Sequence, residues 1–323
     1  MDPKISVVIP AYNGLPFIPK TVQCVLNQEY PAHEIIVIDD GSTDGTPEAL
    51  REFGDRIIVK REANGGISSA RNLGMSLVTG DWIAFLDHDD FWFKNKLRVQ
   101  ADFISRYPNV GFFSCNYAVR YPSTRHHLVN AYDALPNRKR LNFDAPLAGD
   151  PFRLLINENF IGCPSAVIVS KAVTDKVGPF DPAFTHAQDY DYWFQCAAVT
   201  DFLLVSEMLF IKKTHAKNIS RDHVAILLDH KGILLKAAAS FSDLVCGRGY
   251  AGKFRDAIGA ACYELGNTYY NLGQKRSAFS SYLEGLMSSS SWTNLVKFAG
   301  VMLRKVVRIV SFDLLRGEKM RRI

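Results

Sequence analysis

The chain has 323 residues, of which 47% are hydrophobic and 22% are charged, and it carries a formal net charge of +5. These proportions exclude a disordered or fibrous chain, and the length suits one large domain or two. The six cysteines form no C-x-x-C pair, and neither a secretion signal nor an apolar stretch of about 18 residues occurs, so a cytoplasmic protein with reduced thiols is expected.

Four short apolar runs at the start of the chain predict β-strands. They are rich in Ile and Val and do not alternate with polar residues, as is typical of strands covered on both faces. Segments of helical length lie between them, so that strands 5–9, 34–38, 56–60 and 82–86 alternate with helices 16–28, 46–53 and 67–79. This alternation predicts an α/β fold with a Rossmann-like, mainly parallel sheet flanked by helices.

A polar loop follows each of these strands, with the sequences "PAYNG", "DDGSTDGT", "REANGGISSARN" and "DHDD". Asn, Asp, Gly and Ser are also ordinary turn and N-cap residues, so any one loop alone has a structural explanation. In parallel sheets, ligands bind in the crevice beyond the carboxyl ends of the strands. Four such loops at one sheet edge therefore predict a binding site there.

The rest of the chain changes character near residue 222. Before that point "DPFRLLINENF" and "QDYDYWFQCAAV" predict helices and "SAVIVS" predicts a strand, whereas only helices are predicted at 224–241 and 251–310. We therefore expect one domain at 1–222 and a helical region at 223–323. Within this region "YELGNTYYNLGQKRSAFSSYLEGL" resembles one tetratricopeptide unit, which predicts a single hairpin at about 257–290, packed on the first domain or binding a protein partner.

The predicted helix at about 295–323 interleaves aliphatic residues with Lys and Arg. From Lys297 to Ile323 there are eight basic and two acidic residues, which leaves a net charge of about −1 for the residues before them. Such a helix can lie on an anionic membrane, or it can dock on the protein with its basic face in water. No basic stripe precedes it, so nucleic acid is not an expected partner.

The acidic loop "LDHDD" places Asp87, Asp89 and Asp90 within four residues. Three carboxylates this close repel one another unless a cation or a set of donors offsets their charge. Mg²⁺ or Mn²⁺, held by carboxylate oxygens and shared with substrate phosphates, is the simplest remedy. The loop therefore predicts a divalent metal and a diphosphate.

Three stretches together resemble the inverting family-two glycosyltransferases, which have the GT-A fold: "ISVVIPAYNGLPFIPKTVQCVLNQEYPAHEIIVIDDGSTDGT", "REANGGISSARNLGM" and "GDWIAFLDHDDFW". The resemblance is close over about 4–100 and looser to about 220. It implies transfer of a sugar from a nucleotide-diphosphate donor, usually a UDP-sugar, to a hydroxyl of a glycan or lipid-linked glycan in polysaccharide synthesis. Because members often build glycans on lipid carriers, it also favours contact of the basic helix with the inner face of the plasma membrane.

The resemblance also implies roles for single residues at the nucleotide. The segment Pro10, Ala11 and Tyr12 would border the base and ribose pocket, and Asp40 would accept a hydrogen bond from the base. Arg71 would lie near the nucleotide, where a guanidinium suits carbonyl or phosphate oxygens, although a surface helix arginine is the alternative.

In the acidic loop, the resemblance implies that Asp87 faces the ribose and that Asp89 holds the metal bridging the diphosphate. His215, in "IKKTHAKNIS", would be a further metal ligand. Asp90 is expected to be structural or to support its neighbours. The acceptor groove would begin near Phe160, Gly162, Cys163 and Ser165, by position alone.

An inverting transfer needs a carboxylate that takes the proton of the acceptor hydroxyl. "AQDYDYWFQCA" resembles the family's "EDYDLWLRLA", which implies that Asp189 is this general base, with Asp191 as the competitor. Two residues depart from the family pattern, because Gln188 replaces a glutamate and Gln195 replaces an arginine. A supporting ion pair is therefore expected to have become an amide hydrogen bond.

Three other classes explain less of the sequence. A haloacid-dehalogenase-like phosphatase needs Thr or Val where Phe91 stands, and a sugar nucleotidyltransferase expects a Gly-rich phosphate loop near the first strand. A scaffold built on the helical hairpin would leave the acidic loops without a purpose.

Overall fold

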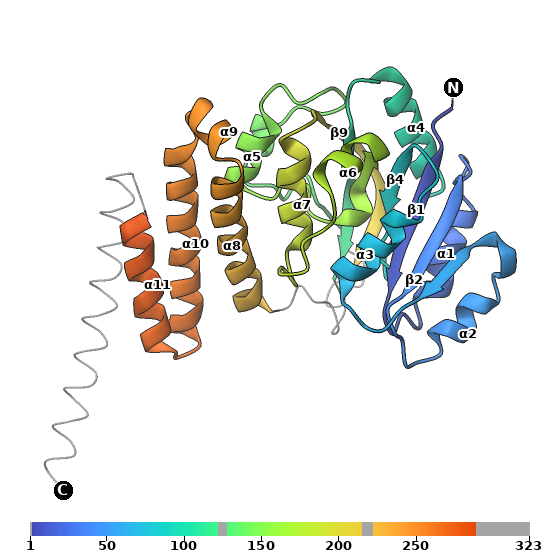
Figure 1. Cartoon of the computed structure of the whole chain (residues 1–323), viewed down its shortest axis with the longest axis horizontal. Coiled ribbons are helices and arrows are strands. Elements are labelled where there is room, and N and C mark those ends of the chain that lie inside the picture. Colours follow the sequence, from blue (N-terminus) through green and yellow to red (C-terminus); the bar gives the residue numbers. More distant parts are fainter. Residues whose placement is uncertain (1, 122–127, 215–221, 289–323) are drawn as a thin grey trace, which may run out of the picture. The chain divides into compact units, whose positions relative to one another are not determined.

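The computed structural model describes residues 2–121, 128–214 and 222–288 (Figure 1). The chain divides after residue 221 into two compact units, which are described in turn. Two predicted features, His215 and the basic segment at about 295–323, lie outside the described residues.

The first unit is built on a sheet whose strand order is β3-β2-β1-β4-β8-β6-β9-β5, with β7 paired to β6. The first four strands are parallel to one another: β1 (Ile5–Ala11), β2 (Glu34–Asp39), β3 (Ile58–Arg61) and β4 (Trp82–Phe85). They are the four predicted from the apolar runs. Their carboxyl ends lie at one edge of the sheet, as the alternation of strands and helices requires.

The other strands make the sheet mixed. They are β5 (Phe91–Trp92), β6 (Phe112–Arg120), β7 (Leu128–Asn130), β8 (Val167–Ser170) and β9 (Phe202–Lys213). Strand β8 runs antiparallel to both of its neighbours, β4 and β6, whereas β9 runs parallel to β6 and antiparallel to β5. The predicted α/β fold with a mainly parallel sheet is confirmed.

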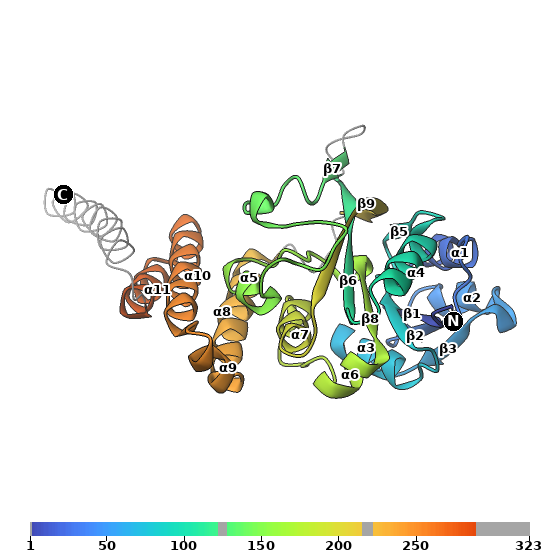
Figure 2. The ribbon, with the colours of Figure 1, turned by 90° about the horizontal axis from the view of Figure 1, so that it is seen from above.

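Helices cover both faces of this sheet (Figure 2). Helices α1 (Ile18–Leu26) and α4 (Lys96–Arg106) lie on one face, and α3 (Ile67–Ser76), α6 (Lys171–Val177) and α7 (Gln188–Ala197) lie on the other. The remaining helices of this unit are α2 (Thr46–Arg51) and α5 (Pro151–Asn157). Gly74 lets α3 approach β1 closely, since a Cβ added there would lie 2.4 Å from a methyl carbon of Val8.

One expectation about the strands is wrong. Strand β3 was expected to be covered on both faces, but all four of its residues are exposed, with Ile58 at 42% and Val59 at 40%. The reason is its place at the edge of the sheet, where it pairs only with β2. An apolar run does not reveal whether a strand is central or at an edge.

The described part of the second unit is helical, as predicted, and consists of α8 (His223–Ser240), α9 (Ser242–Gly247), α10 (Ala251–Asn271) and α11 (Lys275–Ser288). Helices α10 and α11 form a hairpin in which Gly266 packs against the ring of Tyr282, and the hydroxyl of Tyr282 donates to Asn267 Oδ1 at 2.8 Å. Lys231 of α8 forms an ion pair with Glu284 of α11 at 2.8 Å. Across all described ranges, no helix combines the length and apolar character needed to cross a membrane.

Candidate active site

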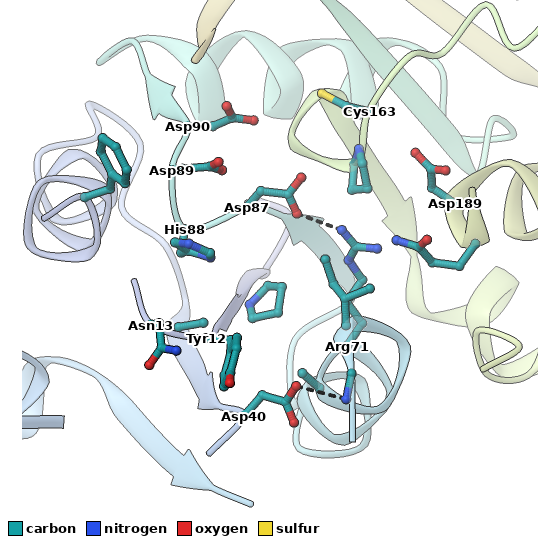
Figure 3. A pocket seen from close by; sticks show the side chains of 18 of the residues that line it. Tyr12, Asn13, Asp40, Arg71, Asp87, His88, Asp89, Asp90, Cys163 and Asp189 are labelled. Atoms are coloured by element: carbon teal, nitrogen blue, oxygen red, sulfur yellow. Dashed lines mark hydrogen bonds and ion pairs between the residues drawn. The ribbon is translucent and has the colours of Figure 1, made fainter. Parts of the chain in front are cut away.

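A cavity of about 690 Å³ opens at the carboxyl ends of β1, β2 and β4 (Figure 3). All sequence-predicted site residues within the described ranges line it: Pro10, Ala11, Tyr12, Asp40, Arg71, Asp87, Asp89 and Asp189. Segments far apart in the chain, from residue 10 to residue 213, therefore meet at one place. His215 cannot be placed, because it lies outside the described residues.

At one end of the cavity, the carboxylate of Asp40 is held by backbone donors. Its two oxygens accept from the amides of Gly65, at 2.7 Å, and Gly66, at 3.0 Å. The loop can approach this closely because residue 41 is glycine, with φ +74° and only 2.8 Å between an added Cβ and the amide nitrogen of Asn64. Each carboxylate oxygen has a second lone pair, so Asp40 can still accept a bond from a ligand.

The loops after β1 and β2 brace each other. The side-chain oxygen of Asn13 accepts from the amide of Thr43 at 2.8 Å, and the amide of Gly14 donates to Thr46 Oγ1 at 2.8 Å. The exposed ring of Tyr12 stands on this braced base. The family resemblance implied no role for Asn13. Its role in holding the two loops together depends on a contact between distant segments.

Arg71 is buried in the floor of the cavity rather than on a helix surface. Its guanidinium is 1% exposed, donates from Nη2 to Asp87 Oδ1 at 2.7 Å and lies 5.5 Å from the ring centre of Phe180. This excludes the alternative of a surface helix arginine. The close ion pair also means that Asp87 meets the cavity with one oxygen already engaged.

The three carboxylates of the acidic loop lie one after another along the cavity but make different contacts (Figure 3). Asp87 pairs with Arg71, Asp89 lines the cavity, and Asp90 is buried and accepts from the amide of Lys213 at 3.2 Å. Burial, reinforced by Asp89 and Asp87, raises the pKa of Asp90 well above its usual range. All three acids line the cavity, but Asp90 is buried and bound to the backbone of β9, whereas Asp87 is bound by Arg71.

The described residues contain no group of three His, Cys, Asp or Glu side chains arranged to hold a metal ion by themselves. Mg²⁺ commonly needs only one or two carboxylates, because substrate phosphates and water complete its coordination. Asp89, at the wall of the cavity, fits that requirement, and Asp87 beside it adds a second oxygen-bearing group.

Asp189 lies in the first turn of α7, on the opposite side of the cavity from the acidic loop (Figure 3). It is half-buried, and its Oδ1 accepts from the amide of Tyr190 at 2.8 Å. Burial raises the pKa of Asp189, although the charges of Arg71 and Lys212 act against that rise. The site therefore holds a carboxylate that is more basic than an ordinary aspartate.

Asp191 does not reach this cavity. It is 2% exposed, and its Oδ2 accepts from the side-chain amide of Gln195 at 2.8 Å. The expected amide hydrogen bond at position 195 is thus present, but it supports Asp191 rather than Asp189. Gln188 does line the cavity, and its buried Oε1 has no hydrogen-bond partner within the described structure.

Two further parts of the wall were not identified from the sequence. Lys212 and Lys213, at the end of β9, line the cavity, although the segment "IKKTHAKNIS" had been considered only for its histidine. Of the positions expected near the acceptor, Cys163 lines the cavity. Ser165 instead is buried and accepts the amide of Asp87 at 3.0 Å, so that it supports the acidic loop.

Comparison with known proteins places this site in a family. The sequence model described as "Glycosyl transferase family 2" matches residues 6–173. An uncharacterized glycosyltransferase of Rickettsia prowazekii, RP339, is 29% identical over 216 residues, which are 67% of this chain and 65% of that protein. The chain therefore matches somewhat less than two thirds of the length of that relative.

Two other matches have more informative names. The Escherichia coli protein WfgD, a "UDP-Glc:alpha-D-GlcNAc-diphosphoundecaprenol beta-1,3-glucosyltransferase", is 31% identical over 194 residues, 59% of this chain and 69% of that protein. The structure of S. aureus TarS 1-349 in complex with UDP-GlcNAc superposes on this chain with a TM-score of 0.62 at 16% sequence identity. The superposition covers 88% of this chain and 81% of that one, so the two share a fold. Since the family model covers more than half of the chain, the protein belongs to glycosyl transferase family 2.

Proposed function

We propose that this glycosyltransferase is a metal-dependent, inverting enzyme that moves a hexose from a UDP-sugar to a hydroxyl of a glycan or lipid-linked glycan. The observation that carries this proposal is the position of Asp189 across one cavity from Asp87 and Asp89. A donor whose diphosphate lies at the acidic loop would turn its anomeric carbon toward Asp189.

The proposed reaction is a single displacement. Asp189 takes the proton of the acceptor hydroxyl while that oxygen attacks the anomeric carbon, and the bond from this carbon to the β-phosphate oxygen breaks. The electron pair of the broken bond leaves with UDP, and the configuration of the sugar inverts because attack and departure occur on opposite faces. The raised pKa of Asp189 suits a group that must accept a proton near neutral pH.

The other residues bind and orient the donor in this proposal. Tyr12 and the backbone around Pro10 and Ala11 flank the base and ribose, and Asp40 accepts a bond from the base. Arg71 holds Asp87 in place through their ion pair, and Asp87 is oriented toward the ribose. A divalent metal, Mn²⁺ or Mg²⁺, held by Asp89 and the phosphates would supply positive charge for the leaving diphosphate.

The choice of UDP rests on similar proteins. The name of WfgD gives UDP-glucose as donor, and TarS is known in complex with UDP-GlcNAc. The acceptor of WfgD is a diphosphoundecaprenol-linked sugar, so a lipid-linked acceptor and a part in cell-envelope glycan synthesis are proposed here too. Such an acceptor would bring the enzyme to the inner face of the plasma membrane, with the segment at about 295–323 as the predicted contact.

The test is turnover of a panel of nucleotide sugars by the full chain, measured as nucleoside diphosphate release with Mn²⁺, with Mg²⁺ and with a chelator. We expect release from a UDP-sugar that is lost on chelation, and a product whose anomeric configuration, read by NMR, is opposite to that of the donor. Asp89→Asn should abolish the metal response, whereas Asp201→Asn, at an exposed position away from the cavity, should not. A product with retained configuration would contradict the single displacement.

A further inference from the structure

Lys212 is brought to the acidic loop by strand pairing. Strand β5, which follows "DHDD" directly, pairs antiparallel with β9, with Phe91 opposite Ile211. The amide of Lys213 then donates to Asp90 Oδ1 at 3.2 Å. The backbone of Lys212 is therefore fixed beside the acidic loop, more than a hundred residues away in the chain.

The charge of Lys212 acts on the acids of the cavity. It lines the cavity wall together with Asp87, Asp90 and Asp189. Burial alone would lower the pKa of Lys212, but the surrounding Cys163, Tyr117, Asp90 and Asp87 raise it overall. The same ammonium lowers the pKa of Asp189, so its field reaches both the acidic loop and the proposed base.

The cations of the cavity differ in what they already bind. Arg71 is paired with Asp87 through Nη2 at 2.7 Å, although its Nε and Nη1 have no hydrogen-bond partner among the described residues. The ammonium of Lys213 lies over the rings of Phe17, at 5.7 Å, and Phe91, at 6.0 Å. Within the described ranges, Lys212 has neither a carboxylate oxygen within 4.0 Å nor a hydrogen-bond acceptor. A charged ammonium without a direct partner, at the wall of a cavity, is suited to binding an anionic ligand.

We propose that the Lys212 ammonium binds a β-phosphate oxygen of the nucleotide sugar and stabilises the negative charge that grows on the diphosphate as it leaves. This assignment rests on the proposed function, because it takes the diphosphate to lie at the acidic loop. Lys212 lines the same cavity as that loop and Asp189, and its charge acts on Asp87, Asp90 and Asp189. The ammonium keeps its proton throughout, and the electron pair of the broken bond stays on the β-phosphate oxygen.

The balance of charge favours such a contact, in addition to the proposed metal. The cavity wall carries five carboxylates, from Asp40, Asp87, Asp89, Asp90 and Asp189, against three cations. A diphosphate adds further negative charge, and a cation aimed at the departing group stabilises the transition state strongly where water is excluded. Lys212 is a cation that can meet this need without giving up an existing ion pair.

The experiment compares UDP with UMP, which lacks the β-phosphate. Binding of both to the full chain is measured by calorimetry with Mg²⁺, for the wild type and for Lys212→Met, Lys212→Arg and Lys213→Met. We expect Lys212→Met to weaken UDP about 10-fold or more and UMP less than about twofold, since one charge-assisted contact is lost. Its kcat for sugar transfer should fall about 100-fold, the effect of removing one charge-stabilising donor.

The matched variants separate contact from general charge. Lys212→Arg keeps the positive charge and should retain most of the preference for UDP over UMP. Lys213→Met removes the neighbouring charge, which is stacked on two rings, and should change that preference far less. If Lys212→Met fails to fold, as judged by thermal unfolding, Lys212→Arg and Lys212→Gln provide the same comparison.

The outcomes also separate this assignment from the proposed function. A wild-type chain that binds none of UDP, GDP and dTDP contradicts the donor class itself, and the role of Lys212 with it. The second case is a wild-type chain that binds UDP. If Lys212→Met then loses as much affinity for UMP as for UDP, or loses none, the role of Lys212 is overturned and the donor class remains intact.

Discussion

The two ends of the cavity hold their polar side chains in different ways. At the end formed by the loops after β1 and β2, polar groups are bound to neighbouring loops: Asp40 to the amides of Gly65 and Gly66, and Asn13 to Thr43. Toward α7 and β9, Lys212 has no direct anionic partner in the described structure, and the side-chain oxygen of Gln188 has no hydrogen bond. Arg71 in the cavity floor shares this feature, since its Nε and Nη1 have no hydrogen-bond partner among the described residues.

This difference suggests a division of labour. Groups that are already hydrogen-bonded are held in place before a ligand arrives, which suits a part of the substrate that does not change, such as a nucleotide. Groups with unused capacity are costly when buried and gain most when a substrate supplies the missing partner. We therefore expect substitutions at the first end to affect nucleotide affinity and folding, and those at the second end to affect chemistry.

The largest expected effect is at the reacting end. Asp189→Asn removes the proposed base without changing its shape, so kcat should fall by about 10³-fold, within the range of general base catalysis. Binding of UDP should change less than about threefold. The comparison is measured by steady-state turnover and calorimetry on the same preparation.

Asp191→Asn is the matched control, since it neutralises a carboxylate two residues away that is buried against Gln195. It should lower stability with little effect on kcat of the folded fraction. A loss of kcat in Asp191→Asn as large as that in Asp189→Asn would break the assignment of the base.

The next effect concerns the nucleotide end. Asp40→Asn leaves one oxygen for two backbone donors and turns an amide N–H toward the other, so one buried bond is lost and an unfavourable contact is added. We expect a free energy of unfolding lower by about 1–3 kcal/mol and UDP binding weaker by about 10-fold. Denaturant titration and calorimetry measure the two changes. An effect on kcat alone, with normal UDP affinity, would contradict the proposed division.

A smaller effect is expected in the pH profile. Because burial raises the folded-state pKa of Asp189 above its usual 3.8, the active, unprotonated base should be lost as pH falls through that raised value. Gln188→Glu adds a negative charge next to Asp189, which raises the pKa of Asp189 further. The acid limb of the pH profile of kcat/KM should therefore move to higher pH in Gln188→Glu. Gln195→Glu is the control and should move it less, because the side chain of Gln195 contacts Asp191 rather than Asp189. An acid limb that stays in place would show that Asp189 is not the group observed.

The smallest effect tests the bracing of two loops. Asn13→Ala removes the acceptor for the amide of Thr43 at the exposed side of the cavity, where water can replace part of the bond. The free energy of unfolding should fall by about 1 kcal/mol and UDP affinity by a few-fold, with kcat retained. A large loss of kcat in this variant would mean that the nucleotide end also takes part in the chemistry.

Local features of the sequence predicted much of this arrangement. The apolar runs and the helical segments between them required parallel strands, and the direction of parallel strands brought four polar loops to one edge. Asp87, Asp89 and Asp90 could be recognised as a possible ligand site because the three carboxylates lie within four positions of the chain. The helical character of the described part of the second unit also followed from periodicity.

Contacts between distant segments could not be predicted in the same way. The exposure of β3 depends on its place at the sheet edge, and the guanidinium of Arg71 is buried where Asp87 and Phe180, from distant segments, lie against it. The pattern of a helix or strand states which residues share a face, but not which neighbour covers that face. For the same reason, the support of Asp87 by Ser165 was unforeseen.

The chemical identity of the site thus came from residues that are close in the chain: the polar loops, the acidic run and the segment around Asp189. The side chains that complete it came from packing. Asp189 and Asp191 are two positions apart and lie on different faces of α7. Only the packing around the helix decides that Asp189 is the one that lines the cavity. Lys212 stands beside Asp90 because β5 pairs with β9, and hydrogen bonds between strands leave no mark on the local sequence of either.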